Sequence, residues 1–464
     1  MKSYKKAIIL ILVILGIAFT LPTFIYINTN TFTKNIESIN SRNDTLKVSK
    51  LSGKIHIKNN WSDAKTAGLC TGSGTFSDPY VIEDLTIDAG GNGSAILIEN
   101  SNVYFTIKNC TIINSKIGEP LSQGAGISLG GVGNGTVINN NITLNDIGIL
   151  INEGYNISIS QNHVFNNLGG IFTASYGFNE IFENNISHNL IGFLGLPFNG
   201  CNFSYNLVKR NQQYGILLYY SLNSSIIGNS IISNNGSGIL LLESRYDNIS
   251  KNKIINNTNY GILSKLISPF IGDPFPIPSY TYISENIITN NTCGIMLNYT
   301  TDNLILNNTV NNNEVSGVEL HFSDSNTILD NNLTGNYHGI KCNESKFNEI
   351  NQNMISNNYY GISLISSHKN NIVQNFINYN HYGISFTSSL RNEIISNVLH
   401  YNWMCFIEDQ DSYSNNFENN DCIETRKKGQ DLIVPLLITT SVTTPLLGLA
   451  IIIILYRRYK RRLK

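Results

Sequence analysis

The sequence predicts an all-β protein in which repeats of 22–23 residues stack as a parallel β-helix of about 13–14 rungs. The main observation is a glycine followed by Ile or another apolar residue, which recurs at nearly constant spacing. Each repeat is too short for a strand and a helix and lacks helical periodicity, so three short strands separated by turns are expected. A thirteenth unit keeps the period at Cys405 without the glycine. The glycines are Gly126, Gly148, Gly170, Gly192, Gly215, Gly238, Gly261, Gly294, Gly317, Gly339, Gly361 and Gly383.

The second observation is a pair of asparagine columns. Asn tolerates left-handed backbone angles, and its amide can hydrogen-bond to the identical amide one rung away. Both columns are predicted to be structural, because a ligand site would be local and these columns run the full length. One column follows the glycines by fourteen residues, apart from one expanded unit, as Asn140, Asn162, Asn184, Asn206, Asn229, Asn252, Asn286, Asn308, Asn331, Asn353, Asn375 and Asn397. The other lies five residues later, as Asn145, Asn167, Asn189, Asn211, Asn234, Asn257, Asn291, Asn313, Asn336, Asn358, Asn380 and Asn402.

The composition agrees with this fold class. The chain contains 71 Asn among 464 residues, and Ile is also abundant. Asn competes for backbone hydrogen bonds and Ile loses side-chain freedom in a helix, so a helical bundle is excluded. The 41% hydrophobic content argues against a disordered polar chain. With 14% charged residues and a formal net charge of -1, no basic face for nucleic acid is implied.

The elements before the repeats are a membrane-targeting segment, a linker and a cap. Residues 1–28 place an apolar run after three lysines, which predicts a signal peptide or a signal anchor. Residues 29–51 are a linker. Residues 52–125 are predicted to form an N-terminal cap, mainly over 52–80, and the first β-helix rungs, because open solenoid ends expose strand edges.

The repeats extend over residues 126–425. An inserted Pro-rich loop lies near 266–280, and residues 406–425, after Trp403, are expected to close the second end of the β-helix. Residues 426–431 form a second linker.

The C-terminal elements predict an integral membrane protein. Residues 432–456 carry no charge and are long enough for a transmembrane helix. The tail, 457–464, is strongly basic, so the positive-inside rule places it in the cytoplasm and residues 29–431 outside the plasma membrane. Without the three N-terminal lysines and the six basic residues of the tail, 22 basic residues stand against 32 acidic ones, a net charge of -10. The extracellular part is therefore predicted to be acidic.

Cysteines and sequons add two smaller predictions. The chain has seven Cys at spacings that match no short metal-binding motif, and the best candidate for a disulfide is Cys405 with Cys422. Asn-x-Ser/Thr occurs 18 times. This composition alone generates roughly ten such motifs by chance, so the prediction of a glycoprotein gains little from the count.

The repeat that starts at Tyr382 carries a family resemblance. Its residues, Tyr-Gly-Ile-Ser-Phe-Thr-Ser-Ser-Leu-Arg-Asn-Glu-Ile-Ile-Ser-Asn-Val-Leu, resemble the β-helix repeat of the NosD-type, carbohydrate-binding and sugar-hydrolase superfamily. The lead-in over 72–87 resembles the opening of prokaryotic, often archaeal, surface proteins. The resemblance covers about residues 52–425 and implies a right-handed single-stranded parallel β-helix. It implies no single activity, because the family includes lyases, hydrolases, a copper-enzyme accessory protein and proteins of no known chemistry.

One strand carries the residues most suited to catalysis. Alternation from Gly317 onward points Glu319 and His321 outward, with Lys341 beside Glu319 one rung later. These three are weak candidates for acid–base work on a sugar polymer, and the alternative is a cross-strand ion pair with a solvated histidine. The Asp-rich calcium site of a lyase and the two opposed carboxyl groups of a glycoside hydrolase are not found. Copper requires Met, Cys and His clusters, which the sequence does not form, so no metal or cofactor is assigned.

An outward apolar strip is the other candidate site, and it should be covered. The candidate cover is the loop 268–279, which would pack on the strip through its aromatic residues and Ile277. Such a lid would be structural, whereas an open patch would bind a glycan or a protein. The strip consists of Leu194, Leu217, Leu240, Leu263 and Met296 on consecutive rungs. The candidate ligand-binding residues are Tyr219, Tyr220, Phe270, Phe275, Leu217 and Leu240.

These observations predict a membrane-anchored extracellular β-helix protein that acts as a cell-surface binding, adhesion or envelope scaffold towards glycans or proteins. The competing prediction is an extracellular polysaccharide lyase or glycoside hydrolase, and a lesser one is a NosD-like copper-enzyme accessory protein. An enzyme should show a polar cleft with convergent carboxylates, whereas a scaffold should show ladders and patches. The partners expected are the membrane and a glycan or surface protein, and not nucleic acid.

Overall fold

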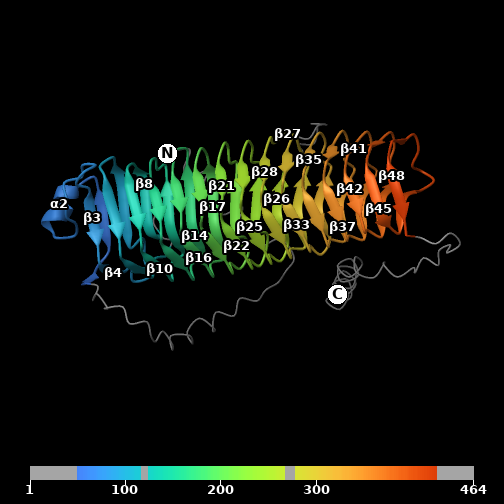
Figure 1. Cartoon of the computed structure of the whole chain (residues 1–464). Coiled ribbons are helices and arrows are strands. Elements are labelled where there is room, and N and C mark those ends of the chain that lie inside the picture. Colours follow the sequence, from blue (N-terminus) through green and yellow to red (C-terminus); the bar gives the residue numbers. More distant parts are fainter. Residues whose placement is uncertain (1–49, 117–123, 267–276, 426–464) are drawn as a thin grey trace, which may run out of the picture. The chain divides into compact units, whose positions relative to one another are not determined.

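The repeats fold into a parallel β-solenoid of about 14 turns with about 23 residues in each turn. The computed structural model describes residues 50–116, 124–266 and 277–425. Each turn contributes one short strand to each of three parallel sheets, named A, B and C, and follows the order B, C, A (Figure 1). The all-β fold and the repeat length predicted from the glycine spacing are confirmed. The chain divides into two units after Glu424, and the solenoid belongs to the first.

The strands of each sheet pair in the order in which they occur along the chain. Sheet A has 16 strands: β1 (Lys50–Ser52), β4 (Leu85–Asp88), β7 (Thr111–Ile113), β10 (Asn141–Thr143), β13 (His163–Phe165), β16 (Asn185–Ser187), β19 (Leu207–Lys209), β22 (Ser230–Ile232), β25 (Lys253–Ile255), β29 (Ile287–Thr289), β33 (Thr309–Asn311), β36 (Asn332–Thr334), β39 (Met354–Ser356), β42 (Phe376–Asn378), β45 (Val398–Asn402) and β48 (Asp421–Glu424).

Sheet B contains the glycine anchors. Its 15 strands are β2 (Ile55–Lys58), β5 (Ile96–Ser101), β8 (Ala125–Val132), β11 (Ile147–Asn152), β14 (Gly169–Ser175), β17 (Ile191–Phe198), β20 (Ile216–Tyr219), β23 (Ile239–Leu242), β26 (Tyr260–Lys265), β30 (Cys293–Asn298), β34 (Ser316–His321), β37 (His338–Asn343), β40 (Tyr360–Ile365), β43 (Tyr382–Thr387) and β46 (Met404–Glu408).

Sheet C completes each turn, and a separate two-stranded sheet pairs β27 (Ile277–Pro278) with β31 (Thr300–Thr301). The 15 strands of sheet C are β3 (Tyr80–Glu83), β6 (Phe105–Lys108), β9 (Gly135–Ile138), β12 (Ser158–Ser160), β15 (Glu180–Phe182), β18 (Asn202–Ser204), β21 (Ser225–Ile227), β24 (Asn248–Ser250), β28 (Tyr282–Ser284), β32 (Leu304–Leu306), β35 (Thr327–Leu329), β38 (Glu349–Asn351), β41 (Asn371–Val373), β44 (Glu393–Ile395) and β47 (Asn416–Glu418).

The core is a column of aliphatic side chains that point inward from the three sheets. In sheet C, for example, Ile350, Ile372 and Ile394 stack in register and are fully buried. Strands lie roughly 4.8 Å apart, so each side chain packs against its equivalents on the turns before and after. The anchor must be glycine, because a Cβ at Gly361 would lie 2.5 Å from the carbonyl oxygen of Gly383.

The asparagine columns form buried hydrogen-bonded ladders. The Asn353 side chain accepts from the backbone N–H and the amide Nδ2 of Asn331, at 2.9 and 3.0 Å. Its own Nδ2 donates to Oδ1 of Asn375 at 3.0 Å. The same Nδ2 also donates to the carbonyl oxygens of Ile328 and Asn351, both at 2.9 Å. One amide therefore satisfies backbone groups of its own turn and of a neighbouring turn, which aliphatic residues cannot do.

The left-handed backbone angles do not belong to the ladder asparagines, so that part of the explanation from the sequence was wrong. They belong to the residue before each one, such as Gln352 with φ 56° before Asn353 and Asn357 with φ 56° before Asn358. What the ladder position requires is a buried amide that both donates and accepts. The left-handed position only requires a residue that tolerates positive φ.

Two further polar columns line the turn from sheet B to sheet C, and the sequence analysis missed both. Asp247 and Thr281 occupy rungs of the third asparagine column, which obscures its period. Its later members are Asn303, Asn326, Asn348, Asn370, Asn392 and Asn415, each accepting from a backbone N–H one rung earlier. A serine column does the same with Ser323, Ser345, Ser367, Ser389 and Ser412.

The two ends of the solenoid differ. At the N-terminal end the short helix α2 (Trp61–Thr66) covers the first turn (Figure 1). Its Trp61 ring is buried, stacks on Tyr80 at 4.9 Å and donates from Nε1 to Ser101 Oγ at 2.8 Å. At the other end, residues 406–425 form no separate cap. They continue the fold through β46, β47 and β48 as one more turn.

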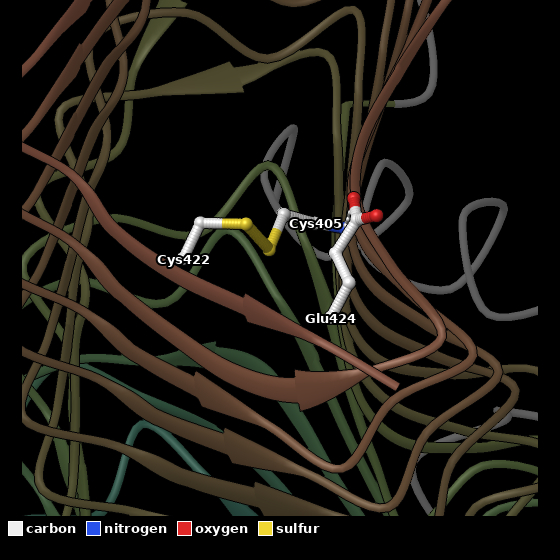
Figure 2. Close-up of side chains that lie close together, drawn as sticks. All are labelled: Cys405, Cys422 and Glu424. Atoms are coloured by element: carbon white, nitrogen blue, oxygen red, sulfur yellow. Dashed lines mark hydrogen bonds between the residues drawn. A yellow bond between two sulfur atoms is a disulfide. The ribbon is translucent and has the colours of Figure 1, made fainter. Parts of the chain in front are cut away.

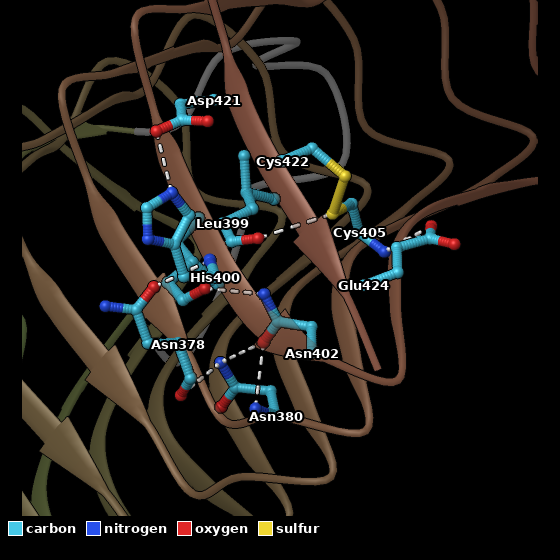
Figure 3. Close-up of a disulfide and its surroundings, with 10 residues drawn as sticks. Asn378, Asn380, Leu399, His400, Asn402, Cys405, Asp421, Cys422 and Glu424 are labelled. Atoms are coloured by element: carbon cyan, nitrogen blue, oxygen red, sulfur yellow. Dashed lines mark hydrogen bonds and ion pairs between the residues drawn. A yellow bond between two sulfur atoms is a disulfide. The ribbon is translucent and has the colours of Figure 1, made fainter. Parts of the chain in front are cut away.

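A disulfide fastens this last turn. Cys405 on β46 and Cys422 on β48 are bonded, and the backbone N–H of Cys405 donates to the Glu424 carboxylate at 3.0 Å (Figure 2). Beside them, His400 Nε2 and Asp421 Oδ2 lie 2.7 Å apart and connect β45 to β48 (Figure 3). The bond therefore ties the end of sheet A to the end of sheet B.

Removing this disulfide is expected to loosen the last turn. The bond closes a loop with a sequence separation of 17, for which chain entropy gives about 3 kcal/mol of stabilisation. Hydrogen exchange in β46–β48 of the full chain should therefore rise about a hundredfold in the double variant Cys405→Ser with Cys422→Ser. Exchange in β8–β11 should not change, because each turn contacts only its neighbours. A reductant should loosen the wild type and leave the double variant unaltered; equal exchange in all samples would contradict the prediction.

Candidate functional site

The ionisable residues singled out in the sequence lie on the outer face of sheet B. Glu319 on β34 pairs in register with Lys341 on β37. Lys341 Nζ donates to Glu319 Oε1 at 2.9 Å, and Ser316 Oγ donates to the other carboxylate oxygen at 2.9 Å. The Glu319 and Lys341 side chains are only 13% and 21% exposed. Both carboxylate oxygens are thus engaged, as in a structural cross-strand ion pair.

Two histidines lie near this pair in the fold, His321 on β34 and His338 on β37. His321 packs its ring against Phe322 at 4.5 Å, and within the described ranges no hydrogen bond connects it to Glu319 or Lys341. His338 lies at the start of β37 and stacks on Tyr360 at 4.9 Å. Burial first, and then the charge of Lys341, lower the pKa of His338 to about 4, so this ring is neutral at pH 7.

The predicted apolar strip is present in register. Leu194, Leu217, Leu240, Leu263 and Met296 are consecutive partners in sheet B. All of them except Leu263 are buried, and the cluster extends towards the N-terminus to Phe172 and Leu150, which the sequence analysis did not include.

The structure describes only some of the residues expected to cover this strip. Phe270 and Phe275 lie outside the described residues, and Ile277 belongs to β27, which pairs with β31. Tyr219 is buried, which raises the pKa of its hydroxyl, whereas Tyr220 beside it is exposed with φ 54°.

Two cavities are lined mainly by turn asparagines. One of about 490 Å³ lies beside Asp84 and Asn109, and one of about 300 Å³ beside Asn257 and Glu314. Each is lined by a single carboxyl group, whereas glycoside hydrolysis requires two on opposite sides of the bond. Neither cavity therefore has the lining of a glycosidase active site.

A second exposed surface is the edge formed by the turns from sheet B to sheet C, called the B–C edge here. It presents one aromatic ring on each of five consecutive turns, and all five residues have left-handed backbone angles. We call these residues the aromatic row: Tyr246, Tyr280, Tyr299, Phe322 and Phe347. The Tyr246 and Tyr280 rings stack at 5.1 Å, and those of Tyr299 and Phe322 at 4.7 Å.

Basic side chains continue this edge beyond the aromatic row. Lys369 follows on the next turn, with its Nζ 5.1 Å from the centre of the Phe347 ring, and Arg391 follows on the turn after that. Lys346 is adjacent to Phe347 in sequence. We call Lys346, Lys369 and Arg391 the basic cluster. Among the described residues none of the three forms an ion pair.

A sequence signal could have identified this edge. Tyr246, Tyr280, Phe347, Lys369 and Arg391 each immediately precede a residue of the third asparagine column. The substitutions in that column and the inserted loop obscured the period. Without the column, these residues had no common register from which a shared surface could be inferred.

Two family models match the chain. The model described as "Right handed beta helix region" matches residues 69–231 and 196–268, which defines the class as a right-handed parallel β-helix. The model described as "Periplasmic copper-binding protein (NosD)" matches residues 279–429. The chain is therefore similar to right-handed β-helix proteins over residues 69–268 and to NosD over residues 279–429, and each match covers less than half of it. No curated protein sequence matches it significantly.

Several solved structures share the fold. The periplasmic alginate epimerase AlgG is 13% identical, with a TM-score of 0.43 over 74% of this chain and 84% of that one. The A-module of the Azotobacter vinelandii mannuronan C-5 epimerase AlgE6 is 12% identical, with a TM-score of 0.44 over 73% and 92%. The catalytic unit of a GH87 α-1,3-glucanase from Streptomyces thermodiastaticus is 11% identical, with a TM-score of 0.48 over 63% and 64%. At these identities the likeness concerns the fold alone.

The family description names copper, and the available ligands can be tested against it. Within the described ranges, one group of three potential ligands comes together, namely Cys405, Cys422 and Glu424 (Figure 2). Its two sulfur atoms are bonded to each other, so neither is the thiolate that binds copper. The residues present do not fit a copper site.

The predicted membrane segments can be compared with the structure only in part. Of the residues that the structure describes, none belongs to a helix long and apolar enough to cross a membrane. The predicted segments 1–28 and 432–456 lie outside those residues.

Proposed function

We propose that this protein is a membrane-anchored binding scaffold on the outer side of the plasma membrane, where its solenoid holds a glycan or protein ligand. The observation that carries the proposal is a difference between two parts of its surface. On the outer face of sheet B, the charged Glu319 is paired with Lys341 and also accepts from the Ser316 hydroxyl. The B–C edge, by contrast, presents aromatic and basic side chains to solvent. Such a surface suits binding more than acid–base chemistry.

The location is supported by sequence and by cysteine chemistry. The uncharged segment 432–456 and the basic tail that follows are the features of a membrane anchor with a cytoplasmic end. The disulfide between Cys405 and Cys422 suits the oxidising environment outside the cytoplasm. The parallel stack of about 14 turns would hold a ligand site away from the membrane on a rigid support.

Two measurements test the proposal on the full chain. Intact cells treated with a membrane-impermeant biotin reagent should yield labelled protein, with labelling of residues in the β-helix. The detergent-purified full chain should then retain glycans or surface proteins on an array and release no new reducing ends from them. Labelling only after lysis would contradict the location, and release of sugar fragments would favour the lyase or hydrolase instead.

A further inference from the structure

The B–C edge presents one ligand-sized group on each of seven consecutive turns. Five turns carry the aromatic row, and the next two carry Lys369 and Arg391. Tyr299 and Phe322 lie three residues earlier in their turns than the other members, where Asp302 and Ser325 hold the equivalent position, so the groups form a band and not a straight line. Six intervals of roughly 4.8 Å give this band a length of about 29 Å along the solenoid axis. The repeat of the surface is comparable to the length of one sugar unit, so the edge is matched to a linear polymer rather than to a small molecule.

The rings of the aromatic row leave much of their apolar surface in contact with water, which is unfavourable for the isolated protein. Tyr246 is 51% exposed, Tyr280 47% and Phe347 51%, and Tyr299 and Phe322 are half-buried. Left-handed backbone is unfavourable for a residue with a side chain, and glycine or asparagine adopts it more readily. Burial offsets little of this cost where half of the ring remains in water. What distinguishes the aromatic row from other exposed tyrosines with positive φ, such as Tyr379 and Tyr401, is the basic cluster that continues the same edge.

The basic cluster is similarly unfavourable for the isolated protein. Lys346, Lys369 and Arg391 are exposed on three successive turns, and like charges at this spacing repel each other. His368 lies among them, and its Nδ1 accepts from the backbone N–H of Leu390 at 3.1 Å. Acidic side chains on the same edge are Asp302, Asp324 and Glu344; Asp324 accepts from the backbone N–H of Lys346, and among the described residues none of the three forms an ion pair with the cluster.

The basic cluster also contrasts with the charge of the extracellular part. That part carries a net charge of -10 once the N-terminal lysines and the basic tail are left aside. The acidic remainder of this surface repels an anionic ligand, but at physiological ionic strength the repulsion is screened beyond roughly 8 Å. Local attraction at Lys346, Lys369 and Arg391 therefore determines where an anion binds.

We propose that the B–C edge binds an anionic polysaccharide lying along the solenoid axis, with sugar rings against the aromatic row and acidic groups against the basic cluster. The proposal rests on the proposed function and specifies its ligand class. Sugar C–H faces pack on aromatic surfaces, and tyrosine hydroxyls can hydrogen-bond to sugar hydroxyls. Single-stranded nucleic acid also combines stacking with positive charge, so it is a distinct outcome of the test.

The test measures binding of the full chain to paired polymers that differ in charge. Polygalacturonate is compared with its methyl ester, dextran sulfate with dextran, and a thymidine oligonucleotide serves as the nucleic acid. At least one anionic polysaccharide should bind tenfold or more tightly than its uncharged partner, and the difference should shrink at high salt. Absence of any such preference, or tightest binding to the oligonucleotide, overturns the proposal.

Two sets of variants locate the site. Tyr246→Asn with Tyr280→Asn should weaken binding of the preferred polymer about tenfold. Lys346→Gln, Lys369→Gln and Arg391→Gln together should remove its preference over the uncharged partner. Asn and Gln suit these exposed turns, so the thermal unfolding temperature should stay within a few degrees of the wild type.

Matched controls exist within the chain. Tyr379 and Tyr401 stack at the same 5.1 Å and 16°, also have positive φ, and are 59% and 47% exposed, but lie on the edge between sheets A and B. Their replacement by Asn should leave binding unchanged, as should replacement of the exposed Lys50, Lys58 and Lys253 by Gln. If test and control variants weaken binding equally, the proposed edge is refuted while a binding scaffold stands. If the wild type binds no glycan or protein at all, the proposed function itself fails.

Discussion

Replacing Asp247 with asparagine is expected to stabilise the protein by about 4 kcal/mol at pH 8 and to leave its stability at pH 4 unchanged. Asp247 occupies a rung of the third asparagine column and is buried. Its Oδ1 accepts from the backbone N–H of Ser224 at 2.9 Å and from Ser221 Oγ at 3.0 Å. Its Oδ2 has no partner among the described residues, at a place where a ladder asparagine carries its donating Nδ2.

The direction follows from burial. Desolvation raises the pKa of Asp247 from 3.8 to about 7, against the smaller opposing effects of Ser224 and Ser221. Below about pH 4 the carboxyl is protonated in both folded and unfolded chains and costs nothing. Between about pH 4 and 7 the unfolded chain releases the proton and the folded chain keeps it, so stability falls as pH rises. Asparagine does not titrate, and its Nδ2 takes the place of the unpartnered Asp247 Oδ2. The variant therefore avoids the loss of stability at high pH.

Urea unfolding of the full-length wild type and of Asp247→Asn at pH 4, 6 and 8 measures the effect. Other carboxyl groups titrate equally in both proteins, so the difference between them isolates this residue. Asp302 lies two turns beyond Asp247 and is only half-buried, so Asp302→Asn is the control for replacing a carboxyl by an amide outside the ladder. A gap between wild type and Asp247→Asn that is equally large at pH 4 and pH 8 would show that the carboxyl is not the cause.

Replacing Asn353 with alanine is expected to cost at least about 4 kcal/mol, the largest loss among the single substitutions considered. The change removes the acceptor for the backbone N–H of Asn331 and the donor for the carbonyl oxygens of Ile328 and Asn351. It also breaks the link to Asn375. Each buried group left without a partner costs roughly 1–3 kcal/mol, and the turn has no neighbouring side chain that replaces the amide.

The loss should be local before it is global. Hydrogen exchange should rise first in the turns that contain Asn331 and Asn375, because a solenoid is stabilised by contacts between adjacent turns. The control is Asn332→Ala, which removes an exposed amide one residue from the ladder and should cost less than about 0.5 kcal/mol. Similar losses of stability for Asn353→Ala and Asn332→Ala would refute the role given to the ladder.

Much of the fold could be predicted because its determinants repeat. The pattern of Gly361, Ile362 and Leu364 recurs on turn after turn. An irregular residue in one repeat therefore does not hide the pattern that the other repeats show. The two asparagine ladders followed from the same period, although the reason given for asparagine was only half correct. The residue before each ladder position, such as Gln352, bears the left-handed angle, and its identity varies too much to form a visible column.

The candidate sites were predicted less well because strict alternation fails at the glycine. Alternation puts His338 on the same side as Ile340, inside the solenoid. In the structure Ile340 is in the core, whereas His338 stacks on Tyr360 at the outer face. The chain bends at Gly339, where a side chain would meet the carbonyl oxygen of Gly361. Alternation from Gly317 therefore placed His321 beside Glu319 and gave no reason to place His338 there.

The sequence by itself determined the period, the stacked aliphatic interior and the polar ladders, because these depend on residues that recur at fixed separation in the chain. Only the tertiary structure decided which side chains share an edge. Tyr246 and Tyr280 are separated by an inserted loop in the sequence, yet their rings lie 5.1 Å apart. Parallel stacking brings equivalent turn positions to the strand spacing whatever the length of the chain between them. The B–C edge became visible once the turns were superimposed in space, because the substitutions in the third asparagine column and the inserted loop obscure its period in the sequence.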